Sequence, residues 1–214
     1  PCSPVLVGNE AREGFVVPGR GDALPSVVGA GSVARAGGGK ICPAGGGPNT
    51  AGMLKDLMLG PPRLTLSVAE SMTGGRLQAL VVEESGASEY FLGGITAYTL
   101  AQKVRHLGVD RATAAAVDCV SAEVARAMAR GACALFGADV GLATTGYAEP
   151  MPARGQPEPG AFWALCHRLP DNRELWAEGF AAARGAGRIQ AQEAVARAVH
   201  AALAAHLGRW RGRS

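Results

Sequence analysis

The stretch LTLSVAESMTGG, residues 64–75, joins a short apolar run to a turn of small and polar residues. Residues 64–69 are mostly apolar and too few for a helix, so we expect a buried strand there. Residues 74–84 carry apolar side chains at helical spacing, namely Leu77, Leu80 and Val81. A strand, a tight turn and a helix in this order are typical of a layered α/β domain.

The same alternation continues on both sides of this stretch. Ser121 is suited to cap a helix, and Gly108 and Gly137 are suited to end one. We expect further strands at 91–98, 138–145, 160–168 and 173–181, and further helices at 53–59, 99–107, 121–136 and 190–207. Because the last two strands form a hairpin, the pattern predicts a three-layer α/β/α domain with a mixed sheet.

The amino-terminal part of the chain has a different composition. The first 50 positions hold 12 Gly and 6 Pro, and the apolar pieces among them are too short to build a core. This composition predicts a disordered extension over residues 1–52, followed by one domain at 53–208 and a basic tail at 209–214. The glycine-rich segment 29–40 lacks the strand and helix that a phosphate-binding loop requires.

Composition excludes several classes of function. The net charge is only +3 and no run of Lys or Arg is present, which argues against nucleic-acid binding. No apolar segment reaches the roughly 18 residues needed to span a membrane. The five cysteines form no CxxC pair and the four histidines are scattered, so we expect free thiols, no metal site and a cytoplasmic protein.

The turn Glu70–Gly75 is the segment with the clearest chemical potential. It lies at the start of a predicted helix, where unpaired N–H groups and the helix dipole favour an anion. One interpretation is therefore a phosphate site, or an oxyanion site for a reaction in which Ser71 attacks a carbonyl. The other is an ordinary helix start with Ser71 or Thr73 as the cap.

A serine nucleophile needs a base, and no histidine follows a predicted strand. Lys103 lies one helical turn beyond the strand that ends at Tyr98, so it can reach the same sheet edge as Ser71; the alternative is a solvated helix lysine. Arg184 and Arg188 are four residues apart and would form an anion-binding fork if both lie on one helix, or ordinary surface charge if not.

Taken in order, these segments resemble the C-terminal domain of the CinA (competence/damage-inducible) family. The family pattern reads roughly AESCTGG, GSSxxFxGG, YSNxxK with LGV after it, VSxxVAxxMAxGA, ADxxLAxTGIAGP, PxGTVW and FxGDRxxxR. The corresponding segments here are AESMTGG, GASEYFLGG, YTLAQKVRHLGV, VSAEVARAMARGA, ADVGLATTGYAEP, PGAFWAL and FAAARGAGR. The resemblance covers about residues 53–207.

The resemblance implies an amidohydrolase of pyridine nucleotide salvage, which converts nicotinamide mononucleotide to nicotinic acid mononucleotide and ammonia. It implies Ser71 as nucleophile, Lys103 as its base and Tyr98 as an aid to proton transfer or to the orientation of Lys103. The substrate-binding residues that it implies are Thr73, Gly74, Gly75, Ser88, Gly146, Arg184 and Arg188. It further implies no cofactor, a small-molecule nucleotide substrate and a homodimer.

The chain departs from the family pattern close to the expected site. In the segment matching TGIAGP, Tyr147 and Glu149 replace Ile and Gly, and residues 151–154 replace an Asp-Gly-Gly stretch. Glu149 adds a negative charge that would repel a phosphate at short range. The alternative function is therefore a divergent member that binds a nucleotide-like ligand or a protein partner without deamidating it. A Glu149 side chain that points into the site would favour this alternative.

Overall fold

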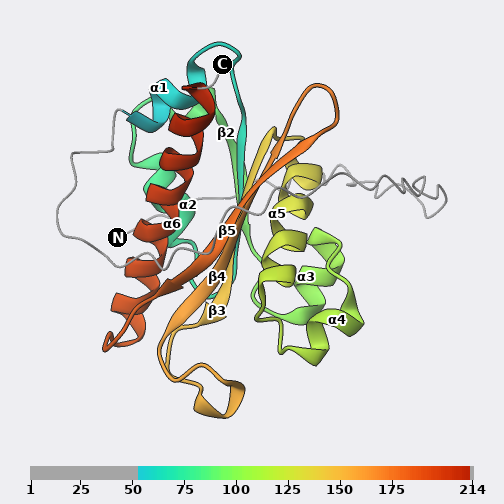
Figure 1. Cartoon of the computed structure of the whole chain (residues 1–214), viewed down its shortest axis with the longest axis vertical. Coiled ribbons are helices and arrows are strands. Elements are labelled where there is room, and N and C mark those ends of the chain that lie inside the picture. The colour runs from blue at the N-terminus through green and yellow to red at the C-terminus, as the bar shows by residue number, and fades with distance from the viewer. Residues whose placement is uncertain (1–52, 213–214) are drawn as a thin grey trace, which may run out of the picture. The chain divides into compact units, whose positions relative to one another are not determined.

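The computed structural model describes residues 53–212, so the predicted extension at 1–52 lies outside the described residues. At its centre is a five-stranded sheet with the order β2-β1-β3-β4-β5 (Figure 1). The strands are β1 (Leu66–Glu70), β2 (Phe91–Thr96), β3 (Val140–Tyr147), β4 (Gly160–Arg168) and β5 (Glu174–Ala182). Strand β1 runs parallel to β2 and β3, and β4 and β5 continue the sheet in antiparallel pairing.

Helices cover both faces of the sheet. Helices α1, α2 and α6 lie on one face, and α3, α4 and α5 lie on the other (Figure 1). Their bounds are α1 (Met53–Leu59), α2 (Arg76–Val82), α3 (Leu100–Leu107), α4 (Arg111–Ala116), α5 (Ala122–Phe136) and α6 (Arg188–Arg211), with short 3-10 turns at Ala87–Glu89 and Pro152–Arg154. The predicted three-layer α/β/α fold with a mixed sheet is confirmed.

The central strands are buried on both faces, which explains their nearly continuous apolar sequence. Along β3, Leu142 faces the core under α2 and α6, whereas Ala143 faces the core under α3 and α5. The core under α3 and α5 is built largely of alanine, so α5 packs closely on the sheet. None of the helices described between residues 53 and 212 is both long and apolar enough to cross a bilayer.

Several predicted ranges shift by about two residues, and the largest differences are at α4 and at the end of α6. Helix α4 was not predicted, because its alanine-rich segment shows no apolar stripe; Asp110 caps it by accepting a hydrogen bond from the Thr113 N–H at 2.8 Å. Helix α6 continues to Arg211, so the predicted tail begins later than residue 209. The Arg211 guanidinium donates to the Leu57 carbonyl at 2.7 Å and thereby joins the end of α6 to α1.

The turn between β1 and α2 is held by Glu70 rather than by a hydroxyl cap. Glu70 is fully buried, and its carboxylate accepts hydrogen bonds from the N–H groups of Gly75, Leu77 and Gln78 at 3.0, 3.1 and 2.9 Å. The interpretation that Ser71 or Thr73 caps this helix is therefore wrong. The same bonds occupy the donors that a bound phosphate would need at this helix start.

Helix α6 and strand β4 bury a histidine pair. His167 Nδ1 lies 3.4 Å from His206 Nε2, and the His167 ring packs edge-on against Trp210. Burial lowers the pKa of His167 to about 4, although Asp139 opposes this shift and Arg211 adds to it. Burial, with smaller contributions from His167 and Arg209, also lowers the pKa of His206 to about 4.

We predict that Glu70→Ala destabilises the domain by on the order of 3 kcal/mol, because buried N–H groups lose their charged acceptor. Glu70→Gln should lose less, since it keeps one acceptor oxygen. The control is Glu193→Gln, which removes a carboxylate from an exposed pair with Arg197. Urea unfolding measures all three variants, and an unchanged midpoint in Glu70→Ala would contradict the capping role.

We also predict that acid destabilises the domain through the histidine pair. Both folded pKa values lie below the ordinary value of about 6.5, so their contribution to stability is complete above about pH 6.5 and is lost as the pH falls toward 4. The loss at pH 5 is on the order of 2 kcal/mol per histidine. His206→Gln should therefore reduce the fall in Tm between pH 7 and pH 5, whereas the exposed control His106→Gln should not. Equal falls in all three proteins would refute this account.

Candidate active site

Three neighbouring strands bring the candidate residues to one edge of the sheet. Ser71 directly follows β1, Tyr98 follows β2, and Glu149 follows β3. Because these strands are parallel and adjacent, their carboxyl ends meet at the same edge. The loop between β3 and β4 extends from this edge, at the lower end of the sheet in Figure 1.

Ser71 and Lys103 meet beneath this edge. Lys103 Nζ lies 2.8 Å from Ser71 Oγ, and the two residues are only 1% and 7% exposed, respectively. The same Nζ donates to the carbonyl oxygens of Ala97 at 2.8 Å and Tyr98 at 3.1 Å. The alternative of a solvated helix lysine is therefore wrong.

The environment of Lys103 favours a neutral amine. Burial lowers the pKa of its side chain, and in the described part of the chain no carboxylate pairs with it. A neutral amine has two N–H groups and one lone pair. The carbonyls of Ala97 and Tyr98 can accept both N–H groups, which leaves the lone pair to accept the proton of the Ser71 hydroxyl.

Cys119 is a neighbour of this pair that the sequence did not reveal. Its thiol interacts electrostatically with Lys103, and burial raises the pKa of the thiol whereas Lys103 lowers it. Cys119 and Asp118 both have positive φ angles, of 62° and 51°, which are unusual for residues other than glycine. The Thr145 hydroxyl donates to the Cys119 carbonyl at 2.6 Å and so joins this loop to β3.

The glycines and Thr73 of the turn have separate roles. Thr73 is fully buried, and its hydroxyl lies 2.8 Å from that of Thr144, so it fastens the turn to β3 rather than lining a pocket. Gly74 is exposed, and Gly75 takes the left-handed φ of 95° that begins α2. Packing explains why residue 146 is glycine, because a Cβ there would collide with the backbone of Ala161 on β4.

Ser88 does not belong to this site within the described chain. It is exposed in the 3-10 turn that precedes β2, and the start of β2 pairs with Leu66 at the start of β1. Ser71 lies beyond the other end of β1. The prediction that Ser88 supplies a supporting hydroxyl to Ser71 is therefore corrected: the two lie at opposite ends of the sheet.

The two arginines are separated by a turn. Arg188 begins α6, whereas Arg184 lies before Gly185, which has a φ of 67°, so the condition for a fork on one helix face is not met. Arg184 is exposed and forms no ion pair or side-chain hydrogen bond with the described residues. It lies at the same sheet edge as Ser71, because the end of β5 pairs with the start of β4.

Arg188 connects Tyr98, a predicted site residue, to Glu149, which departs from the family pattern. Its guanidinium donates to the Tyr98 hydroxyl at 3.0 Å and to the Glu149 carboxylate at 3.1 Å. Tyr98 therefore contacts Lys103 through its backbone carbonyl, whereas its hydroxyl points to Arg188. Orientation of Lys103 by the Tyr98 backbone fits this geometry better than proton transfer by the phenol does.

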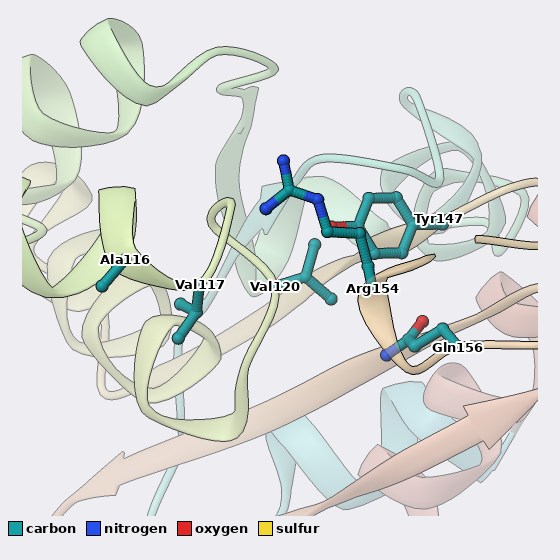
Figure 2. Close-up of a pocket in the computed structure, with 6 residues that line it drawn as sticks. All are labelled: Ala116, Val117, Val120, Tyr147, Arg154 and Gln156. Atoms are coloured by element: carbon teal, nitrogen blue, oxygen red, sulfur yellow. The ribbon is translucent and has the colours of Figure 1, made fainter. Parts of the chain in front are cut away.

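A hollow of about 240 Å³ lies beside the site (Figure 2). Val117 and Val120 face Arg154 and Gln156 across it, and Ala116 and Tyr147 complete its lining. Ser71 and Lys103 do not line the hollow, and Cys119 lies between Val117 and Val120 in the loop that separates it from Lys103.

Polar groups from the altered loop surround this hollow. The Tyr147 hydroxyl donates to Asp118 at 2.9 Å, and burial together with this bond raises the pKa of Tyr147 to about 12. Arg154 lies 3.9 Å from the same carboxylate. Gln156 has a buried Oε1 without a hydrogen-bond partner among the described residues. Across residues 53–212, no three His, Cys, Asp or Glu side chains are grouped to hold a metal ion.

Comparison with known proteins identifies relatives of this chain. A CinA-like protein of Picosynechococcus sp. is 51% identical over 86 residues, which cover 40% of this chain and 20% of that protein. A CinA-like protein of Chlorobium limicola is 45% identical over 98 residues, which cover 46% of this chain and 23% of that protein. The matched segment thus spans about a fifth of the length of these curated relatives.

Solved structures of CinA superfamily proteins share the fold. One from Klebsiella pneumoniae matches with a TM-score of 0.64 and 25% identity, covering 76% of this chain and 99% of that chain. One from Escherichia coli matches with a TM-score of 0.58 and 29% identity, covering 74% and 86%. A family model described as the CinA C-terminal domain matches residues 54–205. This chain belongs to the CinA C-terminal domain family.

Proposed function

We propose that this chain hydrolyses the amide of nicotinamide mononucleotide to nicotinic acid mononucleotide and ammonia, in pyridine nucleotide salvage. The observation that carries the proposal is the 2.8 Å contact between Lys103 Nζ and Ser71 Oγ in a site with almost no solvent exposure. A buried lysine beside a serine, without a carboxylate partner, is the arrangement that a serine–lysine amidase needs. We further propose a cytoplasmic homodimer that uses no cofactor.

The reaction begins with attack by Ser71 on the amide and forms a tetrahedral intermediate. Neutral Lys103 accepts the Ser71 proton while Ser71 Oγ attacks the amide carbonyl, and the carbonyl oxygen becomes an oxyanion. Glu70 occupies the N–H groups of the first turn of α2, so these cannot stabilise that charge. The N–H groups of Met72 and Thr73 have no acceptor among the described residues and are the candidate oxyanion donors.

The remaining steps form the acyl-enzyme, hydrolyse it and release both products. The protonated Lys103 returns its proton to the amide nitrogen as the C–N bond breaks, which releases ammonia and leaves the ester on Ser71. Lys103, neutral again, accepts a proton from a water molecule that attacks the ester. Collapse of this second intermediate expels Ser71 Oγ, which recovers the proton from Lys103, and nicotinic acid mononucleotide leaves.

Arg184 is the candidate ligand for the phosphate of the substrate. Its guanidinium has no ion pair among the described residues and lies at the sheet edge that carries Ser71. Arg188 is a second candidate, although the Glu149 carboxylate engages it in this structure. Two guanidinium groups on one side of the site match the double charge of a phosphate monoester.

A second candidate function is ligand binding without deamidation. The observation that favours it is the Glu149–Arg188 contact, because the carboxylate occupies a group expected to bind phosphate. Calorimetry that shows nicotinamide mononucleotide binding, together with no ammonia release, would support this alternative.

We predict that Ser71→Ala and Lys103→Met each lower the rate of ammonia release by about 10³-fold or more, because the nucleophile and its base act as one unit. The matched control is Lys55→Met, since Lys55 forms an ion pair with Glu89 and lies outside the site. An ammonia assay on nicotinamide mononucleotide measures the rates, and circular dichroism confirms folding. Release that persists in Ser71→Ala would exclude the proposed mechanism.

We predict that kcat/KM rises with pH and then levels off. The base must be unprotonated, so activity follows the neutral fraction of Lys103, which increases as the pH passes through its pKa. Because burial lowers the pKa of Lys103 from its ordinary value of 10.5, the plateau should begin at a lower pH than that value. A kcat/KM that still increases steeply above pH 10.5 would show that Lys103 does not act as the base.

A further inference from the structure

Three side chains at the site edge form a connected chain, which we call the clasp. The Arg188 guanidinium lies at its centre and donates through one nitrogen to Glu149 and through another to Tyr98. These three residues come from the start of α6, the segment after β3 and the segment after β2. The clasp therefore links the start of α6 to the two segments that follow β2 and β3.

Strand order places the clasp across the end of β1. Strand β1 lies between β2 and β3, so a link from Tyr98 to Glu149 passes over the segment that follows β1, where Ser71 lies. Helix α6 supports this placement, since Gln192, one helical turn after Arg188, approaches Gly74. The Tyr98 backbone also shares the Lys103 amine with Ser71.

Exposure differs sharply between the clasp and the residue beneath it. Arg188, Glu149 and Tyr98 are 48%, 61% and 54% exposed, whereas Ser71 is 7% exposed. An ion pair between exposed groups is weak and exchanges its partners readily. The clasp is therefore a part of the site edge that a substrate could rearrange without disturbing the core.

We infer that Glu149 is a specificity-determining residue, which competes with the phosphate of the substrate for Arg188. The inference rests on the proposed amidase function and concerns which amides that site accepts. A phosphate monoester carries close to two negative charges at pH 7 and offers three acceptor oxygens, so it can replace the single carboxylate and also reach Tyr98. A phosphate-free amide makes no such exchange.

Glu149 therefore reduces the advantage of a phosphate-bearing amide over a phosphate-free one. Binding of the phosphate requires Arg188 to leave Glu149, and the displaced carboxylate then lies close to the phosphate and repels it. Neither effect applies to the ribose or to the amide itself. We therefore expect kcat/KM for phosphate-free nicotinamide nucleosides to lie closer to that for the nucleotide than it would without the Glu149 charge.

The test compares nicotinamide mononucleotide with nicotinamide riboside, which carries the same amide and lacks the phosphate. The variant is Glu149→Gln, which keeps the shape and removes the charge. The control is Glu193→Gln, which removes the same charge from the exposed pair with Arg197 elsewhere on α6. Ratios of kcat/KM for the two substrates cancel any effect common to both.

We expect Glu149→Gln to raise the ratio of nucleotide to riboside kcat/KM about threefold to tenfold, mainly through a lower KM for the nucleotide, as expected for one exposed charge. The ratio should stay unchanged in Glu193→Gln. An unchanged ratio in Glu149→Gln, or an equal rise in Glu193→Gln, would overturn the inference.

If the chain lacks the proposed amidase activity, the result differs: no protein releases ammonia from either substrate. Calorimetry then decides the inference by itself. Tighter binding of nicotinamide mononucleotide, but not of the riboside, to Glu149→Gln than to the unaltered chain supports competition for Arg188. Equal affinities in both proteins reject it.

Discussion

The contact between Lys103 Nζ and Ser71 Oγ is the constraint on which the rest of the site depends. A lysine that is 1% exposed is costly to bury as a cation, and burial accordingly lowers its pKa. Among the described residues, this amine contacts two backbone carbonyls and one hydroxyl, and no carboxylate pairs with it. A carboxylate partner would raise the pKa of Lys103, whereas these neutral acceptors leave it lowered by burial.

The fold could be predicted because the signals for its strands and helices lie within short segments of the sequence. The strands β1 and β3 are buried on both faces and are therefore nearly continuous apolar runs in the sequence, and Ser121 and Gly137 mark the ends of α5 by ordinary capping. Helix α4 escaped prediction because it is stabilised by the Asp110 cap and by packing of alanines such as Ala114, which leave no apolar stripe in the sequence.

The site was predictable only in part, for a physical reason. That Ser71 and Lys103 meet follows from parallel strands ending at one edge, which the order of elements already implies. The role of Glu70 depends on where its carboxylate folds back, and the proximity of Cys119 depends on two positive φ angles in its loop. The placement of Ser88 required the register of β2 against β1, because chain order alone does not say which strand end faces the site.

The Glu70 cap has a consequence for recognition. In many α/β proteins the start of the helix after the first strand binds an anionic ligand through its N–H groups. Here an internal carboxylate occupies those groups, so this turn holds Ser71, the proposed nucleophile, and under the proposed function recognition of charge falls to side chains outside the turn. Among the candidates, Arg188 at the start of α6 meets Glu149 in the segment after β3. Under the proposed function, changes in that segment can therefore alter which amide is bound while Ser71 and Lys103 keep their geometry.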